Sequence, residues 1–364
     1  MSQREGATFF LADRTGSQRG PSSRRDGFYN PAMALDRDLC VLFCEHIAGD
    51  GCTSFLDGLG ATGIRGIRIA NEVDADLDVT VNEVNPVSCE RIRDNVACNG
   101  VDVTVSNMDV RVLAHTERYD YVDIDPYGSP APFVHAALDG LYRRGYLAVT
   151  ATDKATLCGV HSKACRRRYD AVPRHGEAMK ELGLRILVGF LVRAAAGRDY
   201  GAIPVFAYSH DHYFRAYFRL HEGARRGNAA LENVGWACWD DGWHMVPYDE
   251  PRGERWAGPL WTGSLFECEA VAAMRRVLPD KTLAYPRQAR RLLETIAGEV
   301  GAPPLYYEAG RLCSRHGLTQ PPINEAIEAL QSEGYRAVRT HFSPDAIKTD
   351  APEGVLASVY ERPG

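Results

Sequence analysis

Short apolar runs alternate with helical patterns over roughly the first 150 residues of this 364-residue chain. Continuous β-prone runs that are too short for helices predict five strands, at residues 53–57, 78–83, 102–107, 119–124 and 145–153. Apolar residues at helical spacing predict helices before and between these strands. Strands that alternate with helices indicate a parallel sheet with right-handed crossovers.

The pattern changes further along the chain. Residues 184–197 predict a core helix, and residues 203–220 predict two strands around the turn at His210-Asp211-His212. Because no helix separates these strands, we expect an antiparallel hairpin at the end of the sheet. The two histidines lack a third ligand nearby, so no metal site is predicted.

Three further segments have patterns of their own. Residues 1–27 are polar without an apolar period and predict a mobile or ligand-ordered arm. Residues 223–266 contain all five tryptophans and predict a packed, irregular connecting segment. Residues 267–364 predict a separate α+β unit in which helix, turn, helix and strand follow one another. That order resembles a winged helix, a common nucleic-acid-binding unit, although a pure packing domain would show the same pattern.

Composition adds limits on class and location. The chain is 45% hydrophobic and 25% charged, as in ordinary globular proteins. Its ten cysteines contain no CxxC pair and are predicted to be reduced, which fits a cytoplasmic protein. We find no signal peptide and no apolar run of about 18 residues, so no membrane partner is expected.

Charge is unevenly distributed. The net charge of −6 argues against a nucleic-acid partner, because cations carry most phosphate binding. Residues 154–175, however, contain six basic residues and one acidic residue, a local charge of +5. This surface, which includes Arg166, Arg167 and Arg168, could hold RNA or could be a solvated helix end.

A glycine turn follows the first predicted strand. The strand ends at Asp57, the turn spans 58–63, and a helix begins at Ile64, so the backbone can approach a ligand at a helix N-terminus. Glu83 ends the next strand, where either a nicotinamide or an adenosyl cofactor would place ribose hydroxyls. Asp109 follows the third strand and could accept from an adenine amine or cap the next segment. A dehydrogenase is therefore an open alternative.

The sequence YDYVDIDPYGSP, residues 119–130, holds the candidate chemistry. Pro126 cannot continue a central strand, so the strand breaks after Ile124 and leaves a carboxylate, Asp125, and a ring, Tyr127, on a tight turn. In open α/β sheets ligands bind at that edge. Phe28 and Tyr29 precede the first predicted helix and could stack on a base or act as hydrophobic staples.

The order of five parallel strands, a helix and a hairpin resembles the Rossmann-like class I fold of S-adenosylmethionine-dependent methyltransferases. DPYG also resembles the Asp/Asn-Pro-Pro-Tyr/Phe motif of enzymes that methylate exocyclic amino groups. Seven segments together closely resemble the archaeal tRNA (guanine-N2)-dimethyltransferase family: FYNPAMALDRD, DGLGATGIRGIR, NEVNP, DIDPYGSP, VTATDKATLCG, DHYFRAYFRL and RTHFSPDAIKTDAP.

The resemblance implies a fold, a reaction and residue roles. The fold would be α/β, with a mostly parallel seven-stranded methyltransferase domain and N-terminal arm in residues 1–222 and a winged-helix-like, tRNA-binding α+β domain in residues 267–364. The reaction would be the transfer of two methyl groups from S-adenosylmethionine to N2 of guanine 26 of tRNA. Asp125 would position the amine and accept its proton, while Phe28 and Tyr127 would hold the flipped guanine. The implied cofactor-contacting residues are Arg37, Asp57, Arg65, Glu83, Asp109 and Val110.

Two departures from the family pattern and three alternatives remain. Tyr127 stands where some members have Phe, and the cysteine quartet that some members carry between the domains is missing, with Cys238 alone in that region. The alternatives are a dehydrogenase, a methyltransferase acting on DNA adenine or a small amine, and a tRNA-binding protein without catalysis. No obligate protein partner is evident.

Overall fold

The computed structural model describes residues 2–12, 28–240, 242–250 and 255–361. The chain divides into two compact units. The first unit consists of residues 1–151, 217–222 and 269–293, and the second of residues 152–216, 223–268 and 294–364. The predicted domain boundaries at 222 and 266 stay predictions.

A seven-stranded sheet has the strand order β5-β4-β3-β6-β7-β9-β8. Neighbouring strands from β5 to β7 pair in parallel, as the alternation of strands and helices predicted. Two residues join β8 to β9, so this pair forms the predicted hairpin. The strands are β3 (Ser54–Asp57), β4 (Asp78–Asn82), β5 (Thr104–Ser106), β6 (Tyr119–Ile124), β7 (Leu141–Ala151), β8 (Tyr200–His210) and β9 (Tyr213–Glu222).

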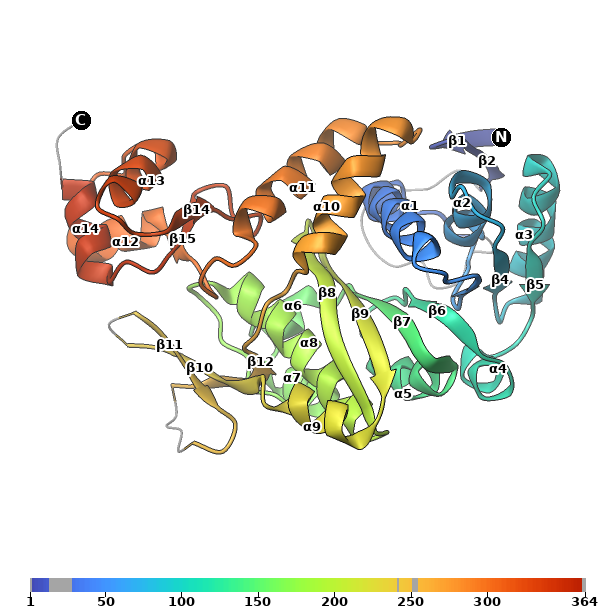
Figure 1. Ribbon diagram of the computed structural model, residues 1–364, viewed down its shortest axis with the longest axis horizontal. Coiled ribbons are helices and arrows are strands. Elements are labelled where there is room, and N and C mark those ends of the chain that lie inside the picture. Colours follow the sequence, from blue (N-terminus) through green and yellow to red (C-terminus); the bar gives the residue numbers. More distant parts are fainter. Residues whose placement is uncertain (1, 13–27, 241, 251–254, 362–364) are drawn as a thin grey trace. The chain divides into compact units, whose positions relative to one another are not determined.

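Helices alternate with the parallel strands; in Figure 1 α2 lies beside β4 and α3 beside β5, and α1 packs against α2. The chain enters α3 through Asn85, whose side chain accepts from the Val87 amide, and leaves it through Gly100 at φ +63°, as the sequence predicted. The helices of this part are α1 (Ala34–Gly49), after the 3-10 turn Pro31–Met33, α2 (Ile64–Glu72), α3 (Pro86–Asn99), α4 (Val110–Thr116) and α5 (Ala131–Asp139).

The N-terminal segment differs from its prediction. Residues 2–12 form an ordered hairpin of β1 (Ser2–Glu5) and β2 (Thr8–Leu11), which contacts α2 and α3, so the prediction of a mobile or ligand-ordered arm is wrong there, because contacts within the chain order the segment. Residues 13–27 of the predicted arm lie outside the described residues. The hairpin buries Phe10, and the Asn95 side chain bonds to the Leu11 backbone. Polar side chains of distant helices thus hold a segment that looks unstructured by itself.

The second unit contains two smaller sheets. Residues 223–266 were predicted to be irregular, but they form α9 and a three-stranded sheet of order β11-β10-β12, in which β10 and β12 carry buried apolar side chains. The elements of this segment are α9 (Ala224–Leu231), β10 (Val234–Trp239), β11 (Trp243–Pro247) and β12 (Ala257–Trp261). The preceding helices are α6 (Lys154–Leu157), α7 (Ser162–Tyr169) and α8 (Met179–Ala196).

The C-terminal part confirms the predicted order of helix, turn, helix and strand. Ile323, Ile327 and Leu330 pack into one apolar cluster, as their spacing predicted. The elements are α10 (Cys268–Val277), the 3-10 turn Leu278–Asp280, α11 (Pro286–Glu299), β13 (Tyr307–Glu308), α12 (Ala309–His316), α13 (Ile323–Ser332), β14 (Ala337–Arg339), β15 (Ala346–Thr349) and α14 (Glu353–Glu361). The strands form a sheet of order β13-β15-β14.

None of the ten cysteines forms a disulfide, which agrees with the predicted reduced state. Among the described helices, none has the length and apolarity that crossing a membrane requires.

Candidate active site

The carboxyl ends of the parallel strands meet at one edge of the first unit. Asp57 at the end of β3 lies level with Asp123 on β6, and Asn82 at the end of β4 lies level with Ser106 on β5. The loops that follow β3, β4, β5 and β6 therefore leave the sheet at the same edge. This is the edge at which open α/β sheets bind ligands.

The glycine turn, residues 58–63, packs closely against this edge. The Gly60 amide donates to the Asn82 carbonyl at 2.8 Å, and the Gly63 amide donates to the Gly60 carbonyl at 2.7 Å. A Cβ atom added at Gly60 would lie 2.5 Å from Val81 Cγ1, so no larger residue fits there without a shift. Gly63 adopts φ +76° immediately before α2. The turn brings backbone to a helix N-terminus as predicted.

Asn82 is a site residue that the sequence analysis missed. Its buried side-chain amide donates to the carbonyls of Gly58 and Met108 at 3.1 Å each, and its oxygen accepts from the Met108 amide at 3.2 Å. It thereby ties the glycine turn to the loop after β5. The NEVNP segment contained this residue, but only the acid beside it was considered.

Glu83 and Asp109 both lie at strand ends, in different surroundings. Glu83 accepts from the amides of Ala61 and Asn85 at 2.9 Å each, so its carboxylate lies against the glycine turn. Asp109 is the N-cap of α4 and accepts from the Arg111 amide and guanidinium. Those hydrogen bonds lower the pKa of Asp109 to about 2. The predicted capping role of Asp109 is present in the structure.

Arg65, in the first turn of α2, connects the glycine turn to Asp125. Its guanidinium lies 2.7 Å from Asp36, 3.8 Å from Asp123 and in a short ion pair with Asp125 Oδ2. Arg65, Asp36 and Asp123 are buried, whereas the Asp125 side chain is 21% exposed. Asp125 therefore faces the helix that follows the glycine turn, and its second oxygen accepts no hydrogen bond from the described residues.

Asp57 and Val110 line the interior of the same region. Asp57 accepts from the Gly66 amide at 3.0 Å. Burial raises the pKa of Asp57 to about 7, against the charge of Arg65 and with some help from the carboxylates of Asp123 and Asp125. Val110 is buried, and its Cγ2 atom would be 2.9 Å from a Cβ added at Gly58. Both residues shape the turn from inside the fold.

Phe28 and Tyr127 form a ring pair although 98 residues separate them in the chain. Their centroids are 5.0 Å apart with an interplanar angle of 64°. Tyr127 is 51% exposed, and burial of its hydroxyl, followed by the charge of Asp125, raises the pKa of Tyr127. The structure thus places two aromatic rings beside the carboxylate that ends β6.

Arg37 is bound by a residue that the sequence analysis did not select. Glu5 of β1 accepts from Arg37 Nε and Nη2 at 2.6 Å each, and Arg37 Nη2 also donates to the Asn30 carbonyl at 3.0 Å. Burial would raise the pKa of Glu5, but the charge and hydrogen bonds of Arg37, together with Arg68, lower it to about 2. Because Glu5 lies in the hairpin predicted to be mobile, no local signal pointed to it.

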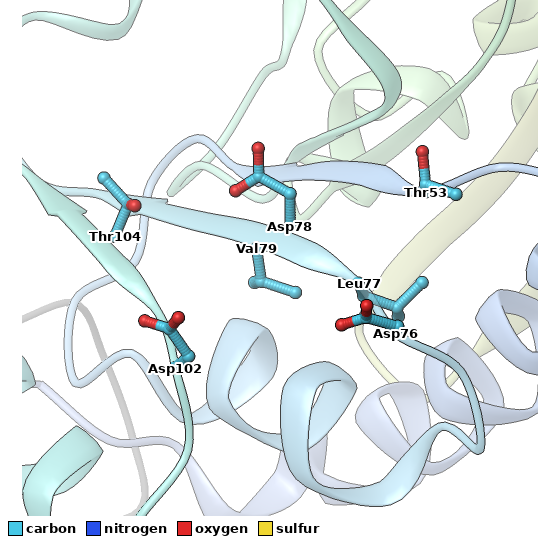
Figure 2. A pocket seen from close by; sticks show the side chains of 7 residues that line it. All are labelled: Thr53, Asp76, Leu77, Asp78, Val79, Asp102 and Thr104. Atoms are coloured by element: carbon cyan, nitrogen blue, oxygen red, sulfur yellow. The ribbon is translucent and has the colours of Figure 1, made fainter.

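A hollow of about 430 Å³ lies at the opposite edge of the sheet, at the amino ends of β3, β4 and β5. Figure 2 shows that the carboxylates of Asp76 and Asp102 do not converge with that of Asp78 on one point. Across the described residues no group of three or more metal-binding side chains is arranged to hold a metal ion. This hollow shares no residue with the glycine turn or the Asp125 turn.

The fold and this edge define the class of protein. A mostly parallel seven-stranded sheet with β9 inserted between β7 and β8, and with a glycine turn after the first parallel strand, is the arrangement expected of a class I methyltransferase. The family model for N2,N2-dimethylguanosine tRNA methyltransferase matches residues 13–361. The chain belongs to this family, which confirms the predicted family, fold and enzyme class.

Known relatives cover nearly the whole chain. The tRNA (guanine(26)-N(2))-dimethyltransferase of Pyrococcus abyssi is 39% identical, over 91% of this chain and 92% of the relative. The protein of the same description from Thermoplasma acidophilum is 35% identical, over 99% and 97%. A solved complex of Trm1 from Pyrococcus horikoshii with S-adenosyl-L-methionine has a TM-score of 0.91 and 35% identity, covering 100% of both chains. S-adenosyl-L-methionine was the predicted cofactor.

The residues at this edge suit that cofactor. A tightly packed glycine turn presents backbone at a helix N-terminus, and Glu83 lies beside it. Each carboxylate oxygen has about two acceptor positions, so Glu83 can bind ribose hydroxyls while keeping its bonds to the Ala61 and Asn85 amides. Arg37 Nη1 makes no hydrogen bond to the described part of the chain, although Arg37 is buried. A donor for an anionic ligand is therefore in place.

Proposed function

We propose that this protein transfers two methyl groups from S-adenosylmethionine to N2 of the guanine at position 26 of tRNA. Family membership supports the reaction. The observation that carries the assignment of residues is the joint position of Asp125, Phe28 and Tyr127, with Asp125 paired to Arg65 of the helix after the glycine turn. A dehydrogenase does not need a partly exposed ring pair and a carboxylate at this turn.

The proposed cofactor-binding residues fall into three groups. Glu83 and Asp109 offer carboxylates to the ribose hydroxyls and to the adenine amine. Arg37 offers Nη1 to an anionic group, while Arg65 faces the carboxylates of the Asp125 turn. Asp57 and Val110 keep the glycine turn in place from the inner side. When bound, the cofactor supplies an electrophilic methyl group on a sulfonium.

Asp125 is proposed to position the guanine amine and to receive its proton. The N2 lone pair is delocalised into the purine, so the nitrogen needs alignment before it can attack. Arg65 fixes Asp125 Oδ2, and the second oxygen can accept an N2 hydrogen. The Pro126 carbonyl is a second acceptor at the same turn. As nitrogen forms its new bond to carbon, the sulfur–carbon electrons stay with sulfur and the N2 proton passes to Asp125. Acid–base help of this kind contributes about 10²–10⁴-fold.

A second methylation must proceed with one N2 hydrogen, because the first transfer replaces the other. Asp125 alone can accept from the remaining hydrogen while the Pro126 carbonyl loses its partner. Once Asp125 has released the first proton to solvent, which its partial exposure allows, the same carboxylate can serve the second round with weaker alignment. Two rounds with unequal alignment are consistent with a site that has one carboxylate, Asp125, fixed by Arg65, and one backbone acceptor, the Pro126 carbonyl.

Phe28 and Tyr127 are proposed to hold the flipped guanine. A base between two rings needs them roughly 7 Å apart, twice the usual contact distance. At 5.0 Å, edge to face, the rings leave no such gap. One ring must therefore turn away on binding. Tyr127 is the candidate, because half of its surface is exposed.

The decisive experiment replaces Asp125 by Asn. We expect methyl transfer to fall by about 10²-fold or more, while calorimetry shows nearly unchanged S-adenosylmethionine binding. Asp120→Asn is the matched control, because Asp120 lies on the preceding strand and, among the described residues, its side chain accepts from Thr53 and Ser54, away from the Asp125 turn. If Asp125→Asn loses cofactor binding and transfer equally, Asp125 is structural and the assignment fails.

The proposed tRNA surface includes α7. Arg166, Arg167 and Arg168 are exposed on this helix, and within the described part of the chain only Arg168 has an acidic partner in an ion pair, Asp153 at 2.9 Å. Reversing the charge of Arg166 and Arg167 should weaken tRNA binding and flatten its salt dependence, measured by salt titration. Unchanged binding would remove α7 from the interface. We place the reaction in the cytoplasm.

A further inference from the structure

Glu5 gathers the polar contacts of the N-terminal hairpin on one buried carboxylate. Besides the two hydrogen bonds from Arg37, it accepts from Arg68 Nη1 at 3.0 Å and from the Tyr29 hydroxyl at 2.8 Å. Both arginines are buried, so these charges are compensated by acids within the fold and hardly by solvent. One side chain of β1 thus joins the start of α1, helix α2 and the loop that contains Tyr29.

The Tyr29 contact leads directly to the guanine side of the candidate site. Tyr29 follows Phe28 in the chain, and its ring lies 4.6 Å from the Phe10 ring and 5.1 Å from the Arg37 guanidinium. Arg37 also holds the Asn30 carbonyl. The two residues after Phe28 are therefore fixed from three sides, by the Glu5 carboxylate, the Phe10 ring and the Arg37 guanidinium. Phe28 itself contacts Tyr127.

We propose that Glu5 is a positioning residue for methyl transfer: through the Tyr29 hydroxyl and Arg37 it sets the loop that places Phe28 against Tyr127. The inference rests on the proposed role of Phe28 in holding guanine. Glu5 touches neither substrate nor cofactor in this scheme. It fixes the ring at the Phe28 side, so that the exposed Tyr127 is the ring that moves when a base enters.

The same carboxylate serves both halves of the site. By binding Arg37 through Nε and Nη2, Glu5 leaves Arg37 Nη1 as the nitrogen available to the cofactor. The Tyr29 bond is a separate contact on the same carboxylate. Removing the Tyr29 hydroxyl therefore breaks the contact of Glu5 on the guanine side and leaves its bonds to Arg37 on the cofactor side in place.

Replacing Glu5 itself would take from the buried Arg37 the acid that binds it in the described part of the chain, and would remove one of the three acidic partners of Arg68. That change would risk unfolding the unit, so the test uses Tyr29→Phe. We expect kcat/KM for tRNA to fall about tenfold, the scale of a lost hydrogen bond to a charged group, with the KM for S-adenosylmethionine unchanged. Tyr119→Phe is the matched control, because its hydroxyl donates to Glu117 at 2.7 Å at the opposite end of β6. It should leave both parameters unchanged.

A double variant distinguishes positioning from general stability. If Glu5 acts through Phe28, Tyr29→Phe will add nothing to the loss caused by Phe28→Ala. Losses that multiply, or a wild-type kcat/KM in Tyr29→Phe, overturn the inference while leaving the proposed function intact. A Phe28→Ala variant as active as wild type overturns the proposed guanine-binding role and this inference together.

Discussion

The two halves of the site are built differently. The proposed cofactor half, made of the glycine turn, Asn82 and Glu83, is joined by bonds to backbone between consecutive strand–helix units. The proposed guanine half, made of Phe28, Arg65, Asp125 and Tyr127, is joined by side chains 60 or more residues apart. Hydrogen bonds to the backbone form whenever the loop adopts its shape. Ion pairs and ring contacts are lost when either of the two side chains is replaced. We therefore expect the guanine half to be more sensitive to loss of one side chain.

The largest effect should follow from Arg65→Met. This change leaves Asp36, Asp123 and Asp125 together without their shared cation, and breaking a buried ion pair costs about 3–5 kcal/mol. Urea unfolding would measure the loss. Arg143→Met is the control, because its ion pair with Glu222 is exposed and should contribute less than about 1 kcal/mol. Equal losses in the two variants would show that the acidic cluster does not depend on Arg65.

A smaller effect is expected from Gly60→Ala in the cofactor half. The new Cβ atom would lie 2.5 Å from Val81 Cγ1 and 3.2 Å from the Asn82 carbonyl, and overpacking of this kind costs about 1–3 kcal/mol. S-adenosylmethionine affinity should fall with stability. At Gly49, where nothing lies within 4 Å of an added Cβ, the same substitution should be tolerated. Undiminished S-adenosylmethionine affinity in Gly60→Ala would show that the glycine turn does not contribute to binding the cofactor.

The smallest effect is a pH dependence from Asp57, which lies between the halves. Burial raises the pKa of Asp57 to about 7, so the folded state holds a proton that the unfolded chain releases near pH 4. The stability due to this proton is lost as pH rises through 7. Relative to Asp57→Asn, the wild type should lose about 1.4 kcal/mol of unfolding free energy between pH 6 and 8. A pH-independent difference would contradict the raised pKa.

The contrast between the halves also explains what the sequence could predict. The glycine turn, Glu83, Asp109 and the break after Ile124 are visible in contiguous residues, and the structure has them where they were expected. Asp125 and Tyr127 were selected for the same reason, because Pro126 marks the end of a strand. Nothing local marks their contact partners.

What the sequence could not reveal is the set of distant contacts. Glu5 lies in a polar segment whose order comes from Arg37, Arg68 and Asn95, residues that follow it by 32 or more positions. Asn82 beside Glu83 looks like an ordinary polar residue until both loops that it joins are present. Whether a polar residue is buried depends on where its partners lie in the fold, and the pattern of apolar and polar residues along the chain does not show this.

The ordered start of the chain has a practical consequence. A variant shortened by its first 12 residues would lose the Phe10 ring from Ile64 and Tyr29, and would expose Glu72, which bonds to Ala7 and Thr8. Such trimming is often done to remove a supposedly loose tail before crystallisation. Here it would remove Phe10 and Glu5, which hold Tyr29 next to Phe28. If Phe28 holds the guanine as proposed, the shortened enzyme should bind its tRNA weakly although every residue of the Asp125 turn is still present.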